Sequence, residues 1–361
     1  MTQLFFSTIH RPGDSCLQDH TLNIDDGRDK LIRVNFGSDL MIFPGLINCH
    51  THLDFDLFPT LAQQPHEDWL DWGNWLHRTH SSLINEIMNV PIKIRTLWGA
   101  YRQLLCGVTQ VVNHGRATLS ETSKVIGSID SDLMFDSIHS RLLRTQMLFR
   151  RKRFHIHLCE GTGLKARQEW DELKRMNLFG REVCAVHGLK IPSLLEPWLT
   201  AIVWCPVSNH NLYLSSLDRD MFEPTPHIFF GTDSTLSAEG DFFKQLRFAR
   251  TQQDNDQELF ESITQKPVNY WGGQARDWVI ALGGSRWDCF FELTPADILL
   301  VVRSGEAVLV DDEAKEWVTY CPKHKIEIGG RTKHLNNDLD GIIKAIKEKA
   351  PNSKLNSLTG W

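Results

Sequence analysis

Short apolar runs alternate with longer segments of helical period through most of this chain. Helix-like segments such as 164–176 and 239–251 lie between the runs. Runs of this length, bounded by polar residues, are typical of strands buried on both faces, and their alternation with helices is typical of a parallel sheet. The pattern predicts an α/β fold whose sheet is open or closed into a barrel. Its apolar runs are residues 108–112, 133–138, 154–158, 183–187, 201–205 and 228–231.

The two ends of the chain have a different pattern. Residues 1–40 indicate short strands separated by polar turns, and the apolar run 41–47 indicates one buried strand. Residues 296–302 and 307–310 also read as strands, so we expect both ends to pair in a small β-sandwich. The predicted division is residues 1–43 and 290–335 for this β domain, 44–289 for the barrel, and 336–361 for a C-terminal amphipathic helix and tail.

Composition narrows the class of protein. The chain has 361 residues, 41% of them hydrophobic and 23% charged, which is ordinary for a soluble globular protein. A net charge of −6 argues against a nucleic-acid partner, which usually requires a basic face. No apolar run reaches the roughly 18 residues that span a bilayer. Residues 1–6 do not resemble a signal peptide, and eight cysteines without a CxxC pair favour a reducing, cytoplasmic location.

His50 and His52 are the first candidate site. On a strand, residues two apart share a face, so their imidazoles can bind one metal ion, and imidazole suits Zn, Fe, Ni and Cu. An HxH pair is a weak signal in a chain with 16 histidines. The pair therefore needs partners from elsewhere in the sequence.

Other strand ends provide such partners. Residues 155–160 place two histidines on one strand and Glu160 just past its end, His187 ends the run 183–187, and Asp233 follows the run 228–231. The carboxyl ends of parallel strands meet on one rim of a barrel, where active sites lie. Repeated metal-ligand and acid–base side chains at these ends favour an active site there.

These segments resemble the amidohydrolase superfamily, in the branch that holds triazine hydrolases, cytosine and guanine deaminases, and adenosyl-compound deaminases. The combination is specific and covers residues 40–303. The matching pieces, in the family's order, are Pro44-Gly45-Leu46-Ile47-Asn48-Cys49-His50-Thr51-His52, His155-Ile156-His157-Leu158-Cys159-Glu160, Ala185-Val186-His187-Gly188, Gly231-Thr232-Asp233-Ser234 and Ala296-Asp297-Ile298-Leu299-Leu300-Val301.

The resemblance implies a distorted (β/α) TIM-like barrel with one divalent metal ion, Zn in preference and Fe(II) as the alternative. His50, His52, His157 and Asp233 would be the ligands, and Asp233 would also accept a proton from the attacking water. A divalent ion makes water acidic enough to ionise near neutral pH. His187 would contact the substrate or the incoming hydroxide, and Glu160 would transfer protons to a ring nitrogen or the leaving group.

The chain departs from the family in its third βα unit. His52 and His157 are 105 positions apart, fewer than the family's spacing, and only 20 residues separate the runs 108–112 and 133–138. One unit is therefore expected to be reduced or absent, with the third favoured. The run 133–138 contains no lysine of the kind that a two-metal site needs, so one metal is preferred. His139, near the fourth strand end, would meet the substrate.

Several assignments stay open. His155 shares a strand face with His157 and could replace it as a ligand, or be a packed histidine, and His114 could be structural. Trp69, Trp72 and Trp75 form a helical stripe that either packs or covers a flat substrate. The turn Ser208-Asn209-His210-Asn211 follows a strand and could line the pocket, with Asn209 and His210 as its candidate substrate-binding residues. The basic residues between 141 and 153 read as a solvated face, with an anionic substrate tail as the alternative.

The favoured function is hydrolytic deamination of an amino-substituted heterocycle, a cleavage of a C–N bond. One alternative is hydrolysis of a cyclic amide, an N-acyl group or a ring halide. Another is a non-catalytic barrel relative that acts in binding or assembly. The expected partner is a small-molecule substrate, without nucleic acid or membrane, and a homodimer is an expectation drawn from the family.

Overall fold

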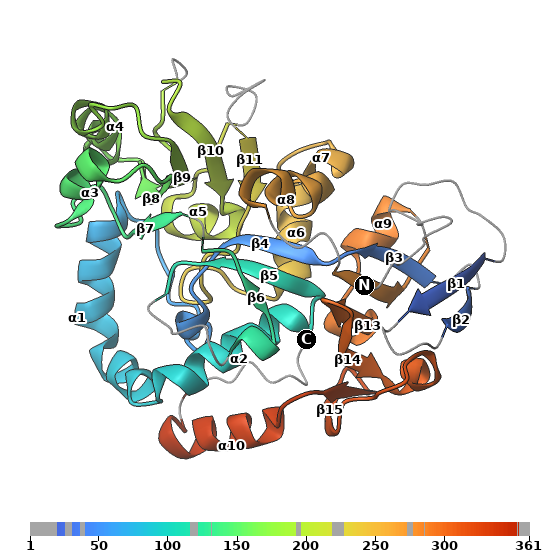
Figure 1. Cartoon of the computed structure of the whole chain (residues 1–361). Helices are drawn as coiled ribbons and strands as arrows, with labels where there is room; N and C mark the ends of the chain where they lie inside the picture. The colour runs from blue at the N-terminus through green and yellow to red at the C-terminus, as the bar shows by residue number, and fades with distance from the viewer. Residues whose placement is uncertain are drawn as a thin grey trace.

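The computed structural model combines parallel strands with a separate antiparallel sheet (Figure 1). β1 (His20–Asp25) and β2 (Leu31–Phe36) pair in a two-stranded antiparallel sheet. Side chains are described from residue 40 onward. The structure describes residues 20–25, 31–36, 40–115, 122–130, 132–192, 196–218, 227–272, 277–284, 286–351 and 353.

Eight strands run parallel in two sheets. Five of the six strands predicted from the apolar runs have observed ends within two residues of the predicted ends. One sheet has the order β4-β5-β6 and the other β11-β10-β9-β8-β7. The apolar character of the runs follows from burial on both faces, since every residue of β8 and β9 is buried. The strands are β4 (Leu46–Thr51), β5 (Val108–Asn113), β6 (Gly127–Ser128), β7 (Leu133–Phe135), β8 (Phe154–Leu158), β9 (Val183–His187), β10 (Leu199–Trp204) and β11 (His227–Phe230).

Among the described residues, hydrogen bonds join the two sheets at the edge formed by β4 and β11. The backbone N–H groups of Thr232 and Asp233 donate to the carbonyl of His50, which joins the end of β11 to β4. Among the described strands, β6 and β7 share no ladder of hydrogen bonds, so the predicted closed barrel is not present as a continuous sheet. The described residues between Ser128 and Leu133 contain no helix. The third unit keeps a two-residue strand and lacks its helix there, as the short spacing suggested.

The run 41–47, predicted as one strand, divides at Gly45. β3 (Leu40–Pro44) pairs with β12 (Trp278–Leu282) in the antiparallel sheet, whereas β4 pairs with β5. A Cβ atom on Gly45 would lie 2.3 Å from Thr109 Oγ1 and 2.8 Å from Asp277 Cβ, so only glycine fits at the crossing. β3 and β4 are both apolar because each is buried in its own sheet. The apolar run 41–47 therefore shows no polar residue at the point where the chain passes from one sheet to the other.

The antiparallel sheet joins distant parts of the chain. Its order is β15-β16-β14-β13-β12-β3, so residues 40–44 pair within the C-terminal part. β12 belongs to the antiparallel sheet, although it precedes residue 289, the predicted end of the barrel domain. The rest of the predicted division into domains remains a prediction. A second layer that would make the sheet a sandwich is not established by the described strands. The remaining strands are β13 (Ile298–Arg303), β14 (Glu306–Asp311), β15 (His324–Ile328) and β16 (Arg331–Leu335).

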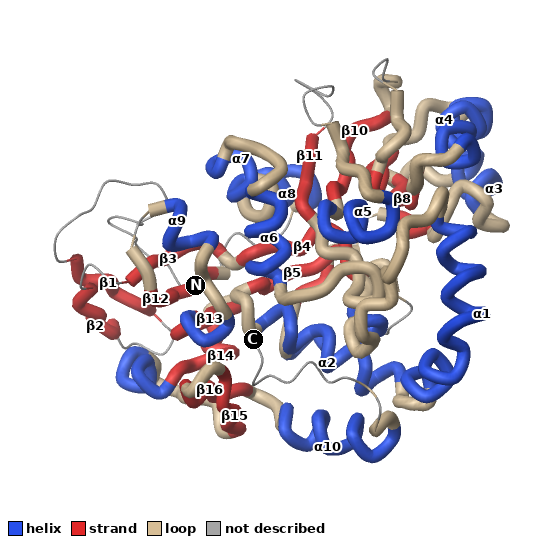
Figure 2. Tube along the Cα trace, turned by 180° about the vertical axis from the view of Figure 1, so that it is seen from behind, coloured by secondary structure: helices blue, strands red, loops and turns tan. Residues whose placement is uncertain are grey.

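Helices cover the parallel strands, and α4 has the bounds predicted from the sequence. The C-terminal helix α10 packs beside α2, at the lower edge of the molecule (Figure 2). No helix among the described residues has the length and apolarity needed to cross a membrane. The helices are α1 (Trp69–Met88), α2 (Ile92–Leu104), α3 (Leu143–Phe149), α4 (Leu164–Met176), α5 (Pro206–Tyr213), α6 (Phe242–Arg250), α7 (Asp256–Glu261), α8 (Gln265–Trp271), α9 (Trp287–Phe291) and α10 (Leu339–Lys349).

Candidate metal centre

The ends of three parallel strands bring four predicted ligands together. His50 lies on β4, His52 follows it, His157 lies on β8, and Asp233 follows β11. One donor atom from each of the four side chains lies within 4.8 Å of the others. Asp233 Oδ1 is 3.7 Å from His50 Nε2 and 3.5 Å from His52 Nε2. The arrangement is the convergence that the strand-end pattern predicted.

Close backbone approach places Asp233 beside β4. A Cβ atom on Gly231 would lie 2.8 Å from Val203 Cγ1 and 2.9 Å from the Cβ of His50, so only glycine allows β11 to lie this near. Asp233 then adopts a left-handed backbone conformation with φ of 59°. Asp tolerates this region better than most residues, and such conformations concentrate at functional sites. His187 has the same feature, with φ of 67°.

The four side chains fit a divalent metal ion such as zinc. Among the described residues, both ring nitrogens of His50 and Nδ1 of His157 are buried without a hydrogen-bond partner, which is costly unless another group binds there. Burial, followed by the neighbouring histidines, lowers the pKa of His50 and of His157 well below the usual value. Burial lowers the pKa of His52 to about 4, although Asp233 opposes the shift. These imidazoles are therefore neutral at pH 7, the form that binds metal.

The two oxygens of Asp233 have different surroundings. Oδ2 accepts hydrogen bonds of 2.7 Å from the hydroxyls of Ser208 and Ser237, whereas Oδ1 faces the histidines. Burial raises the pKa of Asp233, but the surrounding histidines and Ser208 lower it more, so it stays below its ordinary value. The carboxylate is thus ionised and held with one oxygen free to act as a ligand or proton acceptor.

Glu160 and His187 lie beside this group. Glu160 Oε1 is 3.7 Å from His187 Nε2 and accepts a hydrogen bond of 2.7 Å from the hydroxyl of Tyr213. Burial raises the pKa of Glu160, opposed by His187 and Tyr213, and burial raises the pKa of Tyr213 well above its usual value. Asn209 Oδ1 accepts a hydrogen bond of 2.8 Å from His187 Nδ1, so Nε2 is the ring nitrogen that faces Glu160.

The segment between β4 and α1 covers this end of the strands. The carbonyl of Glu67 accepts from the backbone N–H groups of Thr162 and Gly163, and His66 N donates to Leu212 O. Trp69 is half-buried and its Nε1 donates to Glu169 Oε1, while Glu169 Oε2 accepts from Cys159 N. The cover is therefore tied to the turn that carries Glu160.

The predicted substrate-binding residues differ in position. Asn209 contacts His187, and Trp72 is half-buried against the hydrophobic core at the start of α1. His139 has a half-exposed side chain whose Nδ1 is 3.9 Å from Glu172 Oε2, away from the metal-ligand group. His210 is exposed on α5 and its ring lies against Phe248. A direct role in substrate binding stays a prediction for each of these residues.

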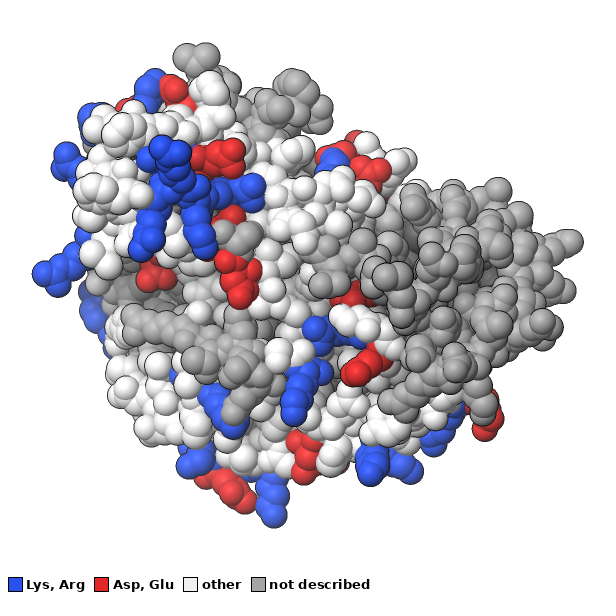
Figure 3. All heavy atoms as spheres, viewed as in Figure 1, with Lys and Arg blue, Asp and Glu red and all other residues white. Residues whose placement is uncertain are grey.

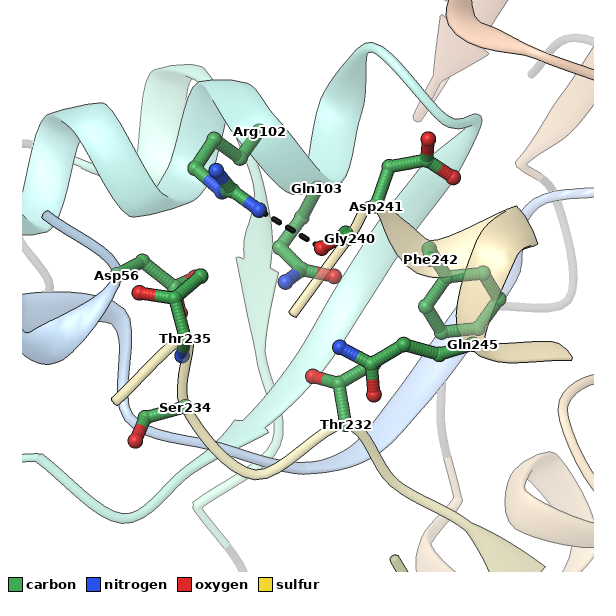
Figure 4. A pocket seen from close by; sticks show the side chains of 10 residues that line it. All are labelled: Asp56, Arg102, Gln103, Thr232, Ser234, Thr235, Gly240, Asp241, Phe242 and Gln245. Atoms are coloured by element: carbon green, nitrogen blue, oxygen red, sulfur yellow. Dashed lines mark hydrogen bonds between the residues drawn. The ribbon is translucent and has the colours of Figure 1, made fainter. Parts of the chain in front are cut away.

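A polar pocket adjoins the segment that carries Asp233 (Figure 4). Thr232 and Ser234 line it, and Arg102 closes one side by donating to the carbonyl of Gly240 at 2.9 Å. Asn48 connects the pocket to β4, because its Nδ2 donates to Thr232 Oγ1 at 2.6 Å and its Oδ1 accepts from Thr232 N at 3.1 Å. Asn48 therefore fixes the turn before Asp233 relative to the strand of His50.

The basic segment between residues 141 and 153 lies on the surface. Figure 3 shows Lys and Arg side chains gathered in the region of α3 and β7, with acidic side chains beside them. Five of the six basic residues are exposed, and Arg153 pairs with Asp132 and Glu182. This agrees with a solvated face. The six are Arg141, Arg144, Arg150, Arg151, Lys152 and Arg153.

Sequence reasoning missed three residues that hold the site: Asn48, Tyr213 and Ser237. Asn48 had a detectable signal, since it precedes His50 by two positions and so shares its strand face. Tyr213 and Ser237 had no signal, because their contacts depend on how α5 and the turn after β11 fold back.

No family model and no curated protein matches this chain. Solved structures do match, at low identity. A triazine hydrolase from Arthrobacter aurescens has a TM-score of 0.64 at 14% identity, over 87% of this chain and 89% of that chain. An atrazine chlorohydrolase from the same species, complexed with zinc, has a TM-score of 0.62 at 14% identity, with the same coverage of both chains. An adenosine deaminase from Xanthomonas campestris with bound zinc has a TM-score of 0.60 at 13% identity, over 88% and 86%.

At these identities the likeness establishes the fold. It supports the α/β fold that the resemblance implied, and the three neighbours are hydrolases and a deaminase, two of them with bound zinc. A shared fold does not determine activity, which depends on the residues of the site.

Proposed function

We propose that this protein is a metal-dependent hydrolase that removes an amino group from a nitrogen heterocycle. The observation that carries the proposal is a buried four-donor group beside a carboxyl–imidazole pair: His50, His52, His157 and Asp233 next to Glu160 and His187. A bound divalent ion, zinc in preference to Fe(II), supplies a Lewis acid and acidifies water. The remaining steps belong to side chains of this chain.

Asp233 acts as ligand and proton acceptor. Its Oδ1 faces the histidines while Ser208 and Ser237 hold Oδ2, so the carboxylate keeps its orientation when a proton arrives. His187 orients the attacked carbon or its substituent through Nε2, because Asn209 fixes the proton on Nδ1.

Glu160 is the general acid. Its raised pKa favours the protonated form, which a departing amine or a ring nitrogen needs. The hydroxyl of Tyr213 holds one carboxyl oxygen, Oε1, and so sets the direction of the other. Glu160 and His187 are both buried, and burial strengthens the electrostatic interaction between them. The segment from His66 to Trp69 is hydrogen-bonded to the turn that carries Glu160 and to Glu169.

The test is ammonia release from a panel of aminopurines, pterins, aminopyrimidines and aminotriazines by zinc-loaded and chelator-treated protein. We expect release from at least one class by the zinc-loaded protein only. Glu160→Gln should retain zinc and lower the rate by about 10²- to 10⁴-fold. Glu182→Gln is the matched control, since Glu182 is exposed and pairs with Arg153. Metal-independent ammonia release, or full activity of Glu160→Gln, would overturn the proposal.

The likeness to a chlorohydrolase favours a second candidate, hydrolysis of a ring halide, or of a cyclic or N-acyl amide, at the same site. Chloride or free amine in place of ammonia would identify it. A non-catalytic binding or assembly protein is the third candidate, and the complete donor set argues against it. Protein that neither contains nor takes up a transition metal would support this third candidate.

We further propose a reducing, cytoplasmic location, a small-molecule partner without nucleic acid or membrane, and a homodimer. Seven cysteines are free among the described residues, which suits a reducing compartment. Light scattering of the purified protein measures the oligomeric state.

A further inference from the structure

Three buried histidines form a second group of nitrogen donors between the two parallel sheets. His50, His114 and His155 each place a ring nitrogen within 4.8 Å of the others. His155 lies on β8 two positions before His157, and His114 follows β5. Their rings lie 5.4 to 6.1 Å apart, with His50 stacked on His155. This group shares only His50 with the four-donor group.

Burial leaves these nitrogens without partners. His155 is 0% exposed, and neither of its ring nitrogens has a hydrogen-bond partner among the described residues. The same is true of Nδ1 of His114 and of both nitrogens of His50. A buried polar atom left unpaired destabilises the folded protein, so a group that binds all three imidazoles would offset that cost.

Two carboxylates stand behind the histidines. Asp136 Oδ1 is 3.2 Å from His114 Nε2, and Asp132 Oδ2 is 4.0 Å from His155 Nδ1. The two residues flank β7, the strand that follows the reduced third unit. A carboxylate on one ring nitrogen orients an imidazole so that its other nitrogen can bind a metal. This leaves His114 Nδ1 and His155 Nε2 for an ion.

We propose that His50, His114 and His155 form an inner position for a zinc-class divalent ion, alternative to the outer group of His50, His52, His157 and Asp233. His50 belongs to both groups, so one ion occupies one position at a time. The outer group includes an anionic carboxylate, whereas the inner group has three neutral donors, so the outer position binds a dication more tightly. The inner position fills when the outer donors are lost.

The test uses the full chain with His52→Gln and Asp233→Asn combined. Titration with Co(II), followed by its visible absorption, should show about one bound ion per chain. Adding His155→Gln should weaken this binding at least tenfold. Adding His334→Gln instead should change it by less than about twofold, because His334 is also buried but lies on β16, outside the candidate metal groups of the described residues. The proposal would be overturned by a folded double variant that binds no Co(II), or by Co(II) binding that His155→Gln leaves unchanged.

If the double variant does not fold, zinc-soaked crystals of the Asp233→Asn variant test whether an ion binds at the inner position. The anomalous peak should lie within bonding distance of His155 Nε2. A peak that stays between His52 and His157, or a water without anomalous signal among the three inner rings, would refute the inner position. Both outcomes leave the proposed hydrolase intact, since that proposal is tested on the wild-type protein.

Discussion

The orientation of the Asp233 carboxylate depends on two serine hydroxyls, and removing one should weaken metal binding. Ser208 and Ser237 each donate to Oδ2 at 2.7 Å, and Ser208 is fully buried. Ser208→Ala leaves the carboxylate with one hydroxyl donor and a freer side chain. A hydrogen bond to a charged group contributes about 1.5–3 kcal/mol.

At about 1.4 kcal/mol for each factor of ten, this loss corresponds to roughly 10- to 150-fold weaker zinc binding if all of it is expressed in the bound state. Outer partners of metal ligands typically contribute about 10- to 100-fold, which agrees. Competition with a chromophoric chelator measures the zinc affinity of the wild type and of Ser208→Ala.

Ser262→Ala is the matched control. Ser262 is also buried and its hydroxyl donates to the carbonyl of Leu259 at 2.6 Å, so the variant should lose stability without losing zinc affinity. If Ser208→Ala binds zinc as tightly as the wild type, Asp233 is not a ligand held by these hydroxyls and the reasoning fails.

Three further predictions follow from packing and charge. Gly231→Ala should lower the free energy of unfolding, measured in urea melts, by about 1–3 kcal/mol and abolish zinc binding, because the added Cβ would meet β4 and β10. Gly73→Ala is the control and should be neutral or stabilising, because Gly73 lies on α1 with open space around it. Lys333→Met should lower the free energy of unfolding by about 3 kcal/mol, since Lys333 is fully buried and donates to the Asp311 carboxylate. A variant that unfolds at the same urea concentration as the wild type would refute this. Burial raises the pKa of Asp56 to about 7, so the native state keeps a proton that the unfolded chain releases, and stability should fall as pH rises from about 4 to 7. Asp56→Asn should remove that part of the pH dependence, and an unchanged pH profile would contradict it.

The strand ends could be predicted because burial on both faces produces uninterrupted apolar runs. β8 and β9 have the predicted bounds, so the positions of His157 and His187 at the rim followed from the sequence. The period of two along β4 placed His50 and His52 on one face. The short spacing before residue 133 located the reduced third unit.

Other features depend on contacts that no local pattern encodes. The apolar run 41–47 continues through Gly45 although the chain changes sheets there, because both sheets bury their residues. His155 and His157 share a face, so only the three-dimensional arrangement separates the inner histidine from the outer one. Tyr213 reaches Glu160 from the end of α5, 53 positions away in sequence.

The central claim is that His50, His52, His157 and Asp233 hold the metal ion that the reaction uses. An anomalous difference map from crystals of the wild-type protein grown with zinc tests it most directly. We expect one dominant peak at about 2.0–2.2 Å from a nitrogen of each histidine and from an oxygen of Asp233. A map without a peak at this position, or with its dominant peak elsewhere in the protein, would contradict the account.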